Sequence, residues 1–99
     1  DARELQMEIR VMRRLRHPHI VRYLGAEWEA GGINIFMELV PGGSVAALLK
    51  TYGPLREPVV RRYTRQILLG VSYLHKRSVV HRDIKGGNVL VSDKGVAKL

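Results

Sequence analysis

The sequence predicts an α+β domain in which amphipathic helices alternate with short antiparallel hairpins. Apolar residues recur at helical spacing over residues 5–15 and again over residues 60–74. Short apolar runs bounded by glycine and turn residues cover residues 20–40 and 89–99, which favours hairpins there. The segment PGGS at residues 41–44 separates the two halves as a hinge-like break.

The first half is predicted to form one helix and two strands. Residues 2 to about 16 place four apolar side chains on one helix face, namely Leu5, Ile9, Met12 and Leu15. Pro18 ends this helix, because the residue before a proline avoids the helical conformation. IVRYLGA at 20–26 alternates as a strand should, and INIFMELV at 33–40 forms the second strand after a loop with two glycines.

The second half is predicted to contain two helices and a second hairpin. Ser44 is placed to cap a helix that starts with VAALLK, and Pro58 fits the first turn of a longer helix that begins near Glu57. The longer helix is expected to bury the face formed by Val60, Tyr63, Ile67, Val71 and Leu74. Residues 79–80 would end a short strand, and VLV and VAKL would pair around the turn SDKG.

Composition limits the class of protein. The chain carries 17 Lys and Arg against 9 Asp and Glu, a net charge of +8, but none of its few aromatic residues alternates with the basic ones, which argues against nucleic-acid binding. The lack of cysteine excludes disulfides, thiolate zinc sites and a cysteine nucleophile. Without a secretory leader or an apolar run of membrane-spanning length, the expected location is the cytoplasm.

The segment VVHRDIKGGNVLV at residues 79–91 contains the residues that indicate a chemical reaction. Phosphoryl transfer to a hydroxyl needs a carboxylate beside that hydroxyl, cations on the phosphate oxygens and a held metal ion. Suitable residue types occur here at fixed spacing: His81, Arg82, Asp83, Lys85 and Asn88. Taken singly, each is an ordinary turn residue, solvated cation or core histidine. Taken together, five specified residues match by chance on the order of once in a million starting points.

This segment resembles the catalytic loop of protein kinases. The resemblance implies that Asp83 accepts or orients the proton of the substrate hydroxyl, that Lys85 lies against the transferring phosphate, and that Asn88 gives its carboxamide oxygen to Mg²⁺. A lysine two residues after the aspartate is the serine/threonine-kinase form of the loop. By the same resemblance, His81 packs rather than reacts, and Arg82 docks a phosphorylated residue of the activation loop, although it could instead form an ion pair that only orients the loop.

The whole chain resembles the middle of the bilobal protein kinase fold. Residues 1–40 would be part of the N-lobe, with its helix C and two strands, and residues 41–99 the hinge and part of the C-lobe, with helices D and E, the catalytic loop and a hairpin. EIRVMRRLRHPHIV marks Glu8 as the helix glutamate that pairs with an ATP-binding lysine, although the residue alone could be a solvated glutamate. Met12 and Tyr23 would share a packing stack with His81.

FMELVPGG matches the strand and hinge that hold adenine in this family. The resemblance implies that Met37 is the gatekeeper and that the Glu38 carbonyl and the Val40 backbone groups form the adenine hydrogen bonds. Ser44 would lie near the ribose, and Leu90 would form the floor under the adenine ring. The implied cofactors are ATP and Mg²⁺.

GGSVAALLKTYGPLREPVVRRYTRQILLGVSYLH together with HRDIKGGN resembles the MAP kinase kinase kinase group of the STE kinases. Its implied protein substrates are MAP kinase kinases, phosphorylated on serine or threonine. Gly87 replaces the usual alanine of that group, which costs up to about 1 kcal/mol in backbone freedom and removes no reacting group.

A Gly-rich loop and a strand lysine do not precede Glu8, and the DFG segment of the family is not among the 99 residues. The chain is therefore expected to be a fragment that does not transfer phosphate alone. Three function classes stay open: an internal piece of an active Ser/Thr protein kinase, a pseudokinase or interaction module that uses the fold as a scaffold, and a basic nucleic-acid-binding domain. Intact Asp83, Lys85 and Asn88 favour the first.

Overall fold

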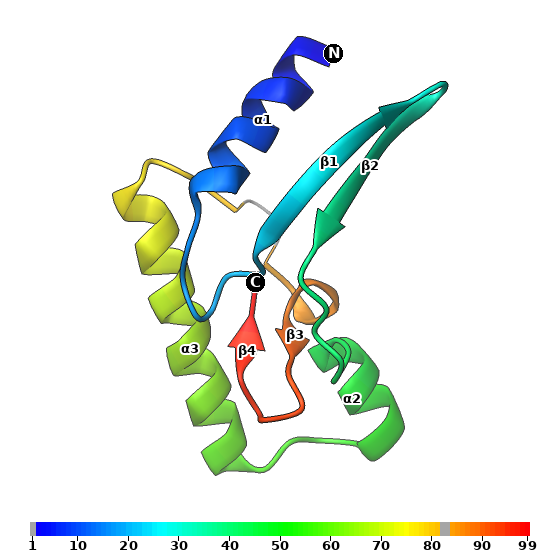
Figure 1. Ribbon diagram of the computed structural model, residues 1–99. Coiled ribbons are helices and arrows are strands. Elements are labelled where there is room, and N and C mark those ends of the chain that lie inside the picture. The colour runs from blue at the N-terminus through cyan, green and yellow to red at the C-terminus, as the bar shows by residue number, and fades with distance from the viewer. Residues whose placement is uncertain (1, 82–83) are drawn as a thin grey trace.

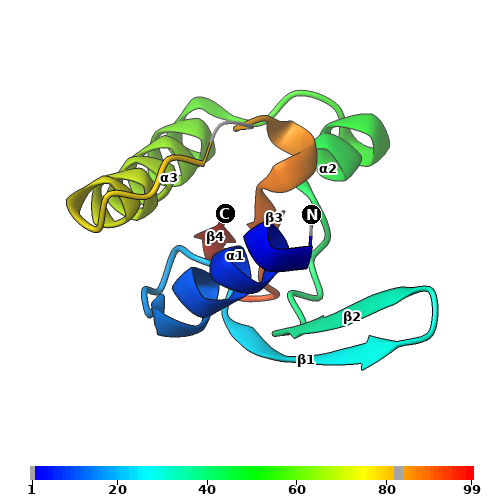
Figure 2. The same ribbon diagram turned by 90° about the horizontal axis from the view of Figure 1, so that it is seen from above.

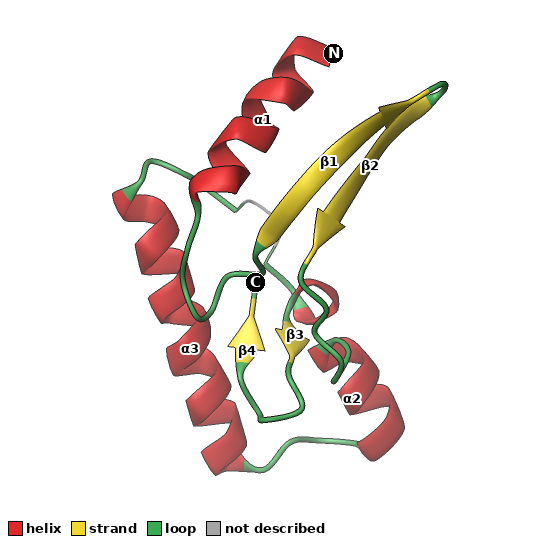
Figure 3. Cartoon of the chain, viewed as in Figure 1, coloured by secondary structure: helices red, strands yellow, loops and turns green. Residues whose placement is uncertain are grey.

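Residues 2–81 and 84–99 are described in a computed structural model of the chain (Figure 1). Within them the helices and strands confirm the α+β class, and the strands form two antiparallel two-stranded sheets (Figure 3). The elements in chain order are α1 (Ala2–Arg14), β1 (Tyr23–Glu29), β2 (Gly32–Met37), α2 (Val45–Tyr52), α3 (Glu57–Lys76), the 3₁₀ turn η1 (Gly86–Asn88), β3 (Leu90–Val91) and β4 (Ala97–Lys98).

The first hairpin is closed by a tighter turn than the predicted loop over residues 27–32. β1 continues to Glu29 and β2 resumes at Gly32, so only Ala30 and Gly31 connect them. Gly31 has φ 95°, a conformation that glycine adopts without a steric penalty and that two-residue hairpin turns require. The tip of the hairpin extends away from the other elements in both views (Figure 1, Figure 2).

A β-bulge divides this hairpin near its base. Tyr23 pairs with Met37 and Gly25 pairs with Phe36, so Leu24 is an extra residue on β1. Tyr23 is buried, whereas Leu24 is 59% exposed. The bulge therefore separates the base of the hairpin, which reaches the core, from the exposed outer part.

Helix α1 ends at Arg14, earlier than predicted. The N–H of Leu15 still donates to the Met12 carbonyl at 3.2 Å, but the next N–H bonds to α3. The N–H of Arg16 donates to the hydroxyl oxygen of Tyr73 at 2.6 Å rather than to a helix carbonyl. The Tyr73 ring lies 4.8 Å from the His17 ring, and the Arg77 guanidinium lies 3.7 Å from the Tyr73 ring centroid on α3. Tyr73 thus joins the exit of α1 to the C-terminal part of α3.

The first strand begins at Tyr23 rather than at the predicted residue 20, for a similar reason. The N–H of Val21 donates to the Leu99 carbonyl at 2.8 Å, and the N–H of Leu99 donates to the His19 carbonyl at 3.0 Å. The His19 ring donates from Nδ1 to the Ala97 carbonyl at 2.9 Å. Residues 19–21 therefore bond to the end of the second hairpin instead of extending β1.

The second strand ends at Met37, before the predicted residue 40, and leads into the hinge-like segment. The predicted cap is confirmed, since the Ser44 Oγ accepts the Ala47 N–H at 3.1 Å at the start of α2. The first residue of α2 then bonds to the residue before β3, since the N–H of Val45 donates to the Val89 carbonyl at 2.8 Å.

A second bond of the same kind joins the N–H of Val91 to the Gly43 carbonyl at 2.8 Å. A Cβ on the neighbouring Gly42 would lie 2.1 Å from the Val91 carbonyl oxygen. Since no side chain fits at that distance, the close contact between hinge and β3 requires glycine at position 42.

The long helix α3 begins at Glu57 with Pro58 in its first turn, as predicted. The predicted burial of its whole apolar face is wrong at the N-terminal end, where Val60 is 44% exposed. Leu74 is buried at the other end, where it packs with the segment that follows α1. The face is thus covered only where other described elements reach it.

The predicted strand at residues 79–80 is also wrong. Ser78 adopts φ 61°, and the N–H of Val79 donates to the Leu74 carbonyl at 2.9 Å. The backbone after α3 therefore closes the helix end instead of pairing with a strand. Val80 is 61% exposed, whereas Val79 packs against the core and so anchors the N-terminal side of the segment at residues 79–91.

The core runs between α1, the base of β1, α3 and the second hairpin. Its buried apolar residues are Ile9, Leu15, Ile20, Tyr23, Val40, Leu74, Val89, Val91 and Ala97. Many large apolar side chains remain at the surface, among them Leu39 and Trp28. In the part of the chain that the structure describes, no helix is long and apolar enough to cross a membrane.

Gly70→Ala in the full-length protein is expected to destabilise it by about 1–3 kcal/mol, because the new methyl overpacks a tight contact. A Cβ at Gly70 would lie 2.9 Å from the His19 carbonyl oxygen, a backbone atom that also bonds Leu99. Denaturant unfolding measures the loss. Gly25→Ala is the matched control, since its Cβ would meet nothing within 4 Å. An unchanged midpoint for Gly70→Ala would contradict this packing.

Candidate functional site

A hollow of about 910 Å³ lies between α1, the base of the first hairpin and the segments on both sides of residues 82–83. It gathers seven residues that the sequence singled out: Glu8, Met12, Tyr23, Met37, His81, Asn88 and Leu90. These residues come from α1, β1, β2, the chain after α3, η1 and β3. The fold therefore brings together groups that lie far apart in the sequence.

The remaining predicted residues lie elsewhere. Glu38, Val40 and Ser44 belong to the hinge beside the hollow, and Lys85 is an exposed residue just before η1; none of the four is in its lining. Arg82 and Asp83 lie outside the described residues.

The catalytic-loop segment is fixed on its C-terminal side. The N–H of Asn88 donates to the Lys85 carbonyl at 2.9 Å, which closes the turn η1. The next residue, Val89, is 3% exposed and Val91 is 4% exposed, so β3 holds the loop in the core. Gly86 lies against α2, where an added Cβ would be 3.4 Å from the Ala46 nitrogen. Asn88 and Lys85 thus sit on a short turn between anchored residues.

The hinge is held by backbone bonds. The N–H of Glu38 donates to the Arg22 carbonyl at 2.9 Å, and the N–H of Gly43 donates to the Val40 carbonyl at 3.4 Å. Val40 is 9% exposed, whereas Met37, at the mouth of the hollow, is 47% exposed. The hinge therefore has a buried side at Val40 and runs past the hollow at Met37.

The carboxylate of Glu38 has a role that sequence reasoning missed. Its Oε1 accepts the backbone N–H of Arg22 at 2.8 Å, and Lys98 Nζ lies 3.1 Å from both carboxylate oxygens. Burial alone would raise the pKa of Glu38, but the Arg22 hydrogen bond, together with the hydrogen bond and charge of Lys98, holds that pKa below its usual range. No local pattern could have joined two residues so far apart in sequence.

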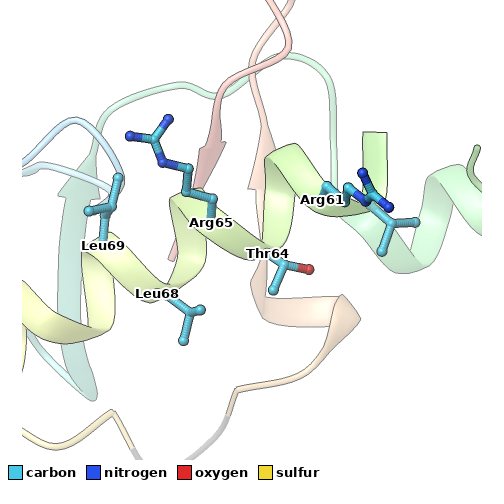
Figure 4. A pocket seen from close by; sticks show the side chains of 6 residues that line it. Arg61, Thr64, Arg65, Leu68 and Leu69 are labelled. Carbon is cyan, nitrogen blue, oxygen red and sulfur yellow. The ribbon is translucent and has the colours of Figure 1, made fainter. Parts of the chain in front are cut away.

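A smaller hollow of about 470 Å³ lies on the outer face of α3 and holds no predicted site residue (Figure 4). Its wall is formed by Val60, Arg61, Thr64, Arg65, Leu68 and Leu69, all from that helix. Leu68 is 61% exposed, and Arg61 already pairs with Glu57 at 2.6 Å. This surface offers neither a carboxylate nor a loop for phosphate chemistry, so the larger hollow is the candidate site.

The family described as Protein kinase domain matches residues 1–99. The chain belongs to the protein kinase family. The segment at residues 79–91 and the hinge therefore lie within a protein kinase domain.

Kinases of one group are among the similar curated proteins. The chain is 54% identical over 96 residues to "Mitogen-activated protein kinase kinase kinase ANP1" of Arabidopsis thaliana and 52% identical over 95 residues to "Serine/threonine-protein kinase STE11" of Saccharomyces cerevisiae. These alignments cover 97% and 96% of the chain but only 14% and 13% of the two relatives. The chain thus corresponds to a small part of each.

A solved kinase structure has the same arrangement of elements. The chain shares 32% identity and a TM-score of 0.90 with the structure titled "Crystal structure of Rad53 1-466 in complex with AMP-PNP". The match covers 96% of this chain and 26% of that one. The resemblance to the middle of the kinase fold is confirmed, while the roles of single residues stay predictions.

The donor atoms near the hollow fit Mg²⁺ only together with a nucleotide. Among residues 2–81 and 84–99, no three His, Asp or Glu side chains gather in a way that could hold a metal ion. Asn88 is half-buried and offers a neutral carboxamide oxygen, which suits a hard cation. Since Mg²⁺ in ATP sites takes most other ligands from phosphates and water, one such oxygen fits the Mg²⁺–ATP complex.

Glu38→Gln in the full-length kinase should reduce stability at neutral pH by an amount that shrinks on acidification. The folded pKa of Glu38 lies below its unfolded value, so its contribution is complete above the unfolded pKa and is lost as pH falls through the folded pKa. Gln keeps an acceptor for Arg22. Denaturant unfolding of both proteins between about pH 7 and pH 3 measures the difference. A pH-independent difference would disprove the role of the ionised carboxylate.

Proposed function

We propose that the protein containing this chain transfers the γ-phosphoryl group of ATP to serine or threonine hydroxyls of protein substrates, as a MAP kinase kinase kinase in a signalling cascade. The observation that carries this proposal is the intact HRDIKGGN loop on a buried hairpin, in a chain of the protein kinase family. The names of the similar relatives support MAP kinase kinases as the protein substrates. The cytoplasm is the proposed location.

In this proposal, residues of the catalytic loop perform the transfer. Asp83 holds the substrate hydroxyl and takes its proton as the oxygen bonds to the γ-phosphorus. The bond from that phosphorus to the oxygen bridging to the β-phosphate breaks, and ADP leaves. Lys85 stabilises the negative charge on the transferring phosphate. When bound through Asn88 and the phosphates, Mg²⁺ supplies further positive charge at these oxygens.

The nucleotide lies between the two proposed lobes, residues 1–40 and 41–99. Backbone groups of Glu38 and Val40 bond adenine, Met37 is the gatekeeper, and Ser44 lies near the ribose. Leu90 forms the floor of the slot, in keeping with its place on β3 beside the hollow. A neutral, apolar floor suits the adenine ring.

The packing residues have a separate role. Glu8 is the proposed partner of a strand lysine, and Met12, Tyr23 and His81 form a stack that joins α1 to the catalytic-loop segment. The shared lining of one hollow by all four residues supports this assignment.

Asp83→Asn in the full-length protein is expected to lower turnover of a MAP kinase kinase by about 10²–10⁴-fold, the usual contribution of a general base. Affinity for AMP-PNP should change little, because the proposed role of Asp83 is to hold the hydroxyl and not the nucleotide. Phosphate incorporation and calorimetric binding measure the two effects. Asp93→Asn, in the exposed turn after β3, is the matched control.

Asn88→Ala should instead weaken Mg²⁺-dependent nucleotide binding, since it removes an oxygen from the metal.

Near-normal turnover of Asp83→Asn would refute the assignment of Asp83. Nucleotide binding without turnover in the wild-type protein would favour the pseudokinase alternative.

Arg82→Ala is expected to abolish activation by phosphorylation of the activation loop. A guanidinium beside the catalytic aspartate can hold a phosphate through two hydrogen bonds and so order the segment that carries it. The ratio of phosphorylated to unphosphorylated activity should fall to about one. Arg56→Ala is the control, since Arg56 is exposed and makes no side-chain cap bond. Equal stimulation of the mutant and the wild-type protein by phosphorylation would contradict the proposed role of Arg82.

A further inference from the structure

The ion pair between Glu38 and Lys98 is the most shielded one that the described residues show in detail. Their side chains are 27% and 19% exposed, whereas those of the Glu57–Arg61 pair on α3 are 73% and 79% exposed. Both carboxylate oxygens of Glu38 lie 3.1 Å from Lys98 Nζ. A partly buried pair with this geometry is screened less by solvent and salt than a surface pair. It can therefore hold two segments in a fixed relation.

Glu38 is attached to the first hairpin at two points. Its backbone N–H donates to the Arg22 carbonyl at 2.9 Å, and its Oε1 accepts the Arg22 N–H at 2.8 Å. These bonds continue the hairpin past Met37, with the carboxylate oxygen in the place of a strand carbonyl. The orientation of the peptide group after Glu38, which contains the Glu38 carbonyl, therefore depends on where the Glu38 side chain is held.

Lys98 is fixed from the other side. It stands directly opposite Leu90 in the β3–β4 pair. The preceding residue, Ala97, is fully buried, and its N–H donates to Gln66 Oε1 at 2.7 Å. The backbone of Lys98 is thus set by the same hairpin that carries Leu90, and its ammonium group reaches the hinge.

We propose that the Glu38–Lys98 ion pair sets the height of the adenine slot, by holding the Glu38 carbonyl at a fixed distance from Leu90. The inference rests on the proposed function, in which these two groups contact adenine. Lys98 and the Glu38 side chain are positioning residues, because neither one touches the nucleotide.

Loss of the pair has a specific kinetic consequence. Without Lys98, Glu38 keeps its bonds to Arg22 but loses its own link to the β3–β4 hairpin, while the hinge stays bonded to that hairpin only further along, where the N–H of Val91 donates to the Gly43 carbonyl. ATP binding must then order the slot. The free-energy cost of this ordering weakens the binding of the ground state and the binding of the transition state by the same amount. Such a change raises KM for ATP and leaves kcat at saturating ATP almost unaltered. A general loss of folding would lower kcat as well.

The test uses the full-length protein with three variants of this pair. Lys98→Met removes the charge, Glu38→Gln keeps an acceptor for Arg22, and Lys98→Arg restores a cation. We expect Lys98→Met and Glu38→Gln each to raise KM for ATP and the Kd for AMP-PNP by about fivefold, with kcat within about twofold of wild type. Lys98→Arg should recover most of the affinity. Lys94→Met, in the exposed turn of the same hairpin, is the control.

The double variant Glu38→Gln with Lys98→Met should bind AMP-PNP no more weakly than either single variant, because the two changes remove one interaction. Unchanged affinity in Lys98→Met would overturn the inference, as would fully additive losses in the double variant. If wild-type protein binds AMP-PNP but does not transfer phosphate, the proposed function fails, and the binding measurements still decide the role of the pair.

Discussion

The backbone N–H and C=O groups on the two outer edges of the β3–β4 hairpin need hydrogen-bond partners. The hinge, α3 and the segment after α1 supply these partners, and their positions around the hairpin follow from that. On one edge, Val91 bonds the hinge at Gly43. On the other edge, Ala97 bonds Gln66 of α3 and the His19 ring. One small hairpin therefore fixes the hinge, the long helix and the segment after α1 around the candidate site.

Much of the fold could be predicted because its signals are local. Two helix starts could be identified without knowledge of the tertiary structure. Ser44 lies three residues before the N–H that it caps, and Pro58 lies in the first turn of α3. The predictions are wrong where hydrogen bonds to residues outside the local pattern determine the backbone conformation. The strand expected from residue 20 is displaced by bonds to Leu99, and the strand at 79–80 is replaced by a helix closure through Val79. β-branched residues indicate extended chain but not its partner.

In the candidate site, too, local sequence patterns could be recognised and contacts between distant residues could not. The five residues of the predicted catalytic loop stand out in the sequence because they lie within eight positions, and the hollow contains Asn88 and His81 from that run, while the role of each stays a prediction. The link between Glu38 and Lys98 could not be found, since sixty positions separate them and each is an ordinary charged residue by itself.

The bulge at Leu24 has a consequence for how this hairpin can change in length during evolution. Pairing is in one register at Tyr23 and in another from Gly25 to the tip. Residues added in pairs at the Ala30–Gly31 turn lengthen only the outer register, whereas loss of the extra residue Leu24 would merge the two registers into one. A change in length at the tip therefore leaves the pairing of Tyr23 with Met37 unaltered.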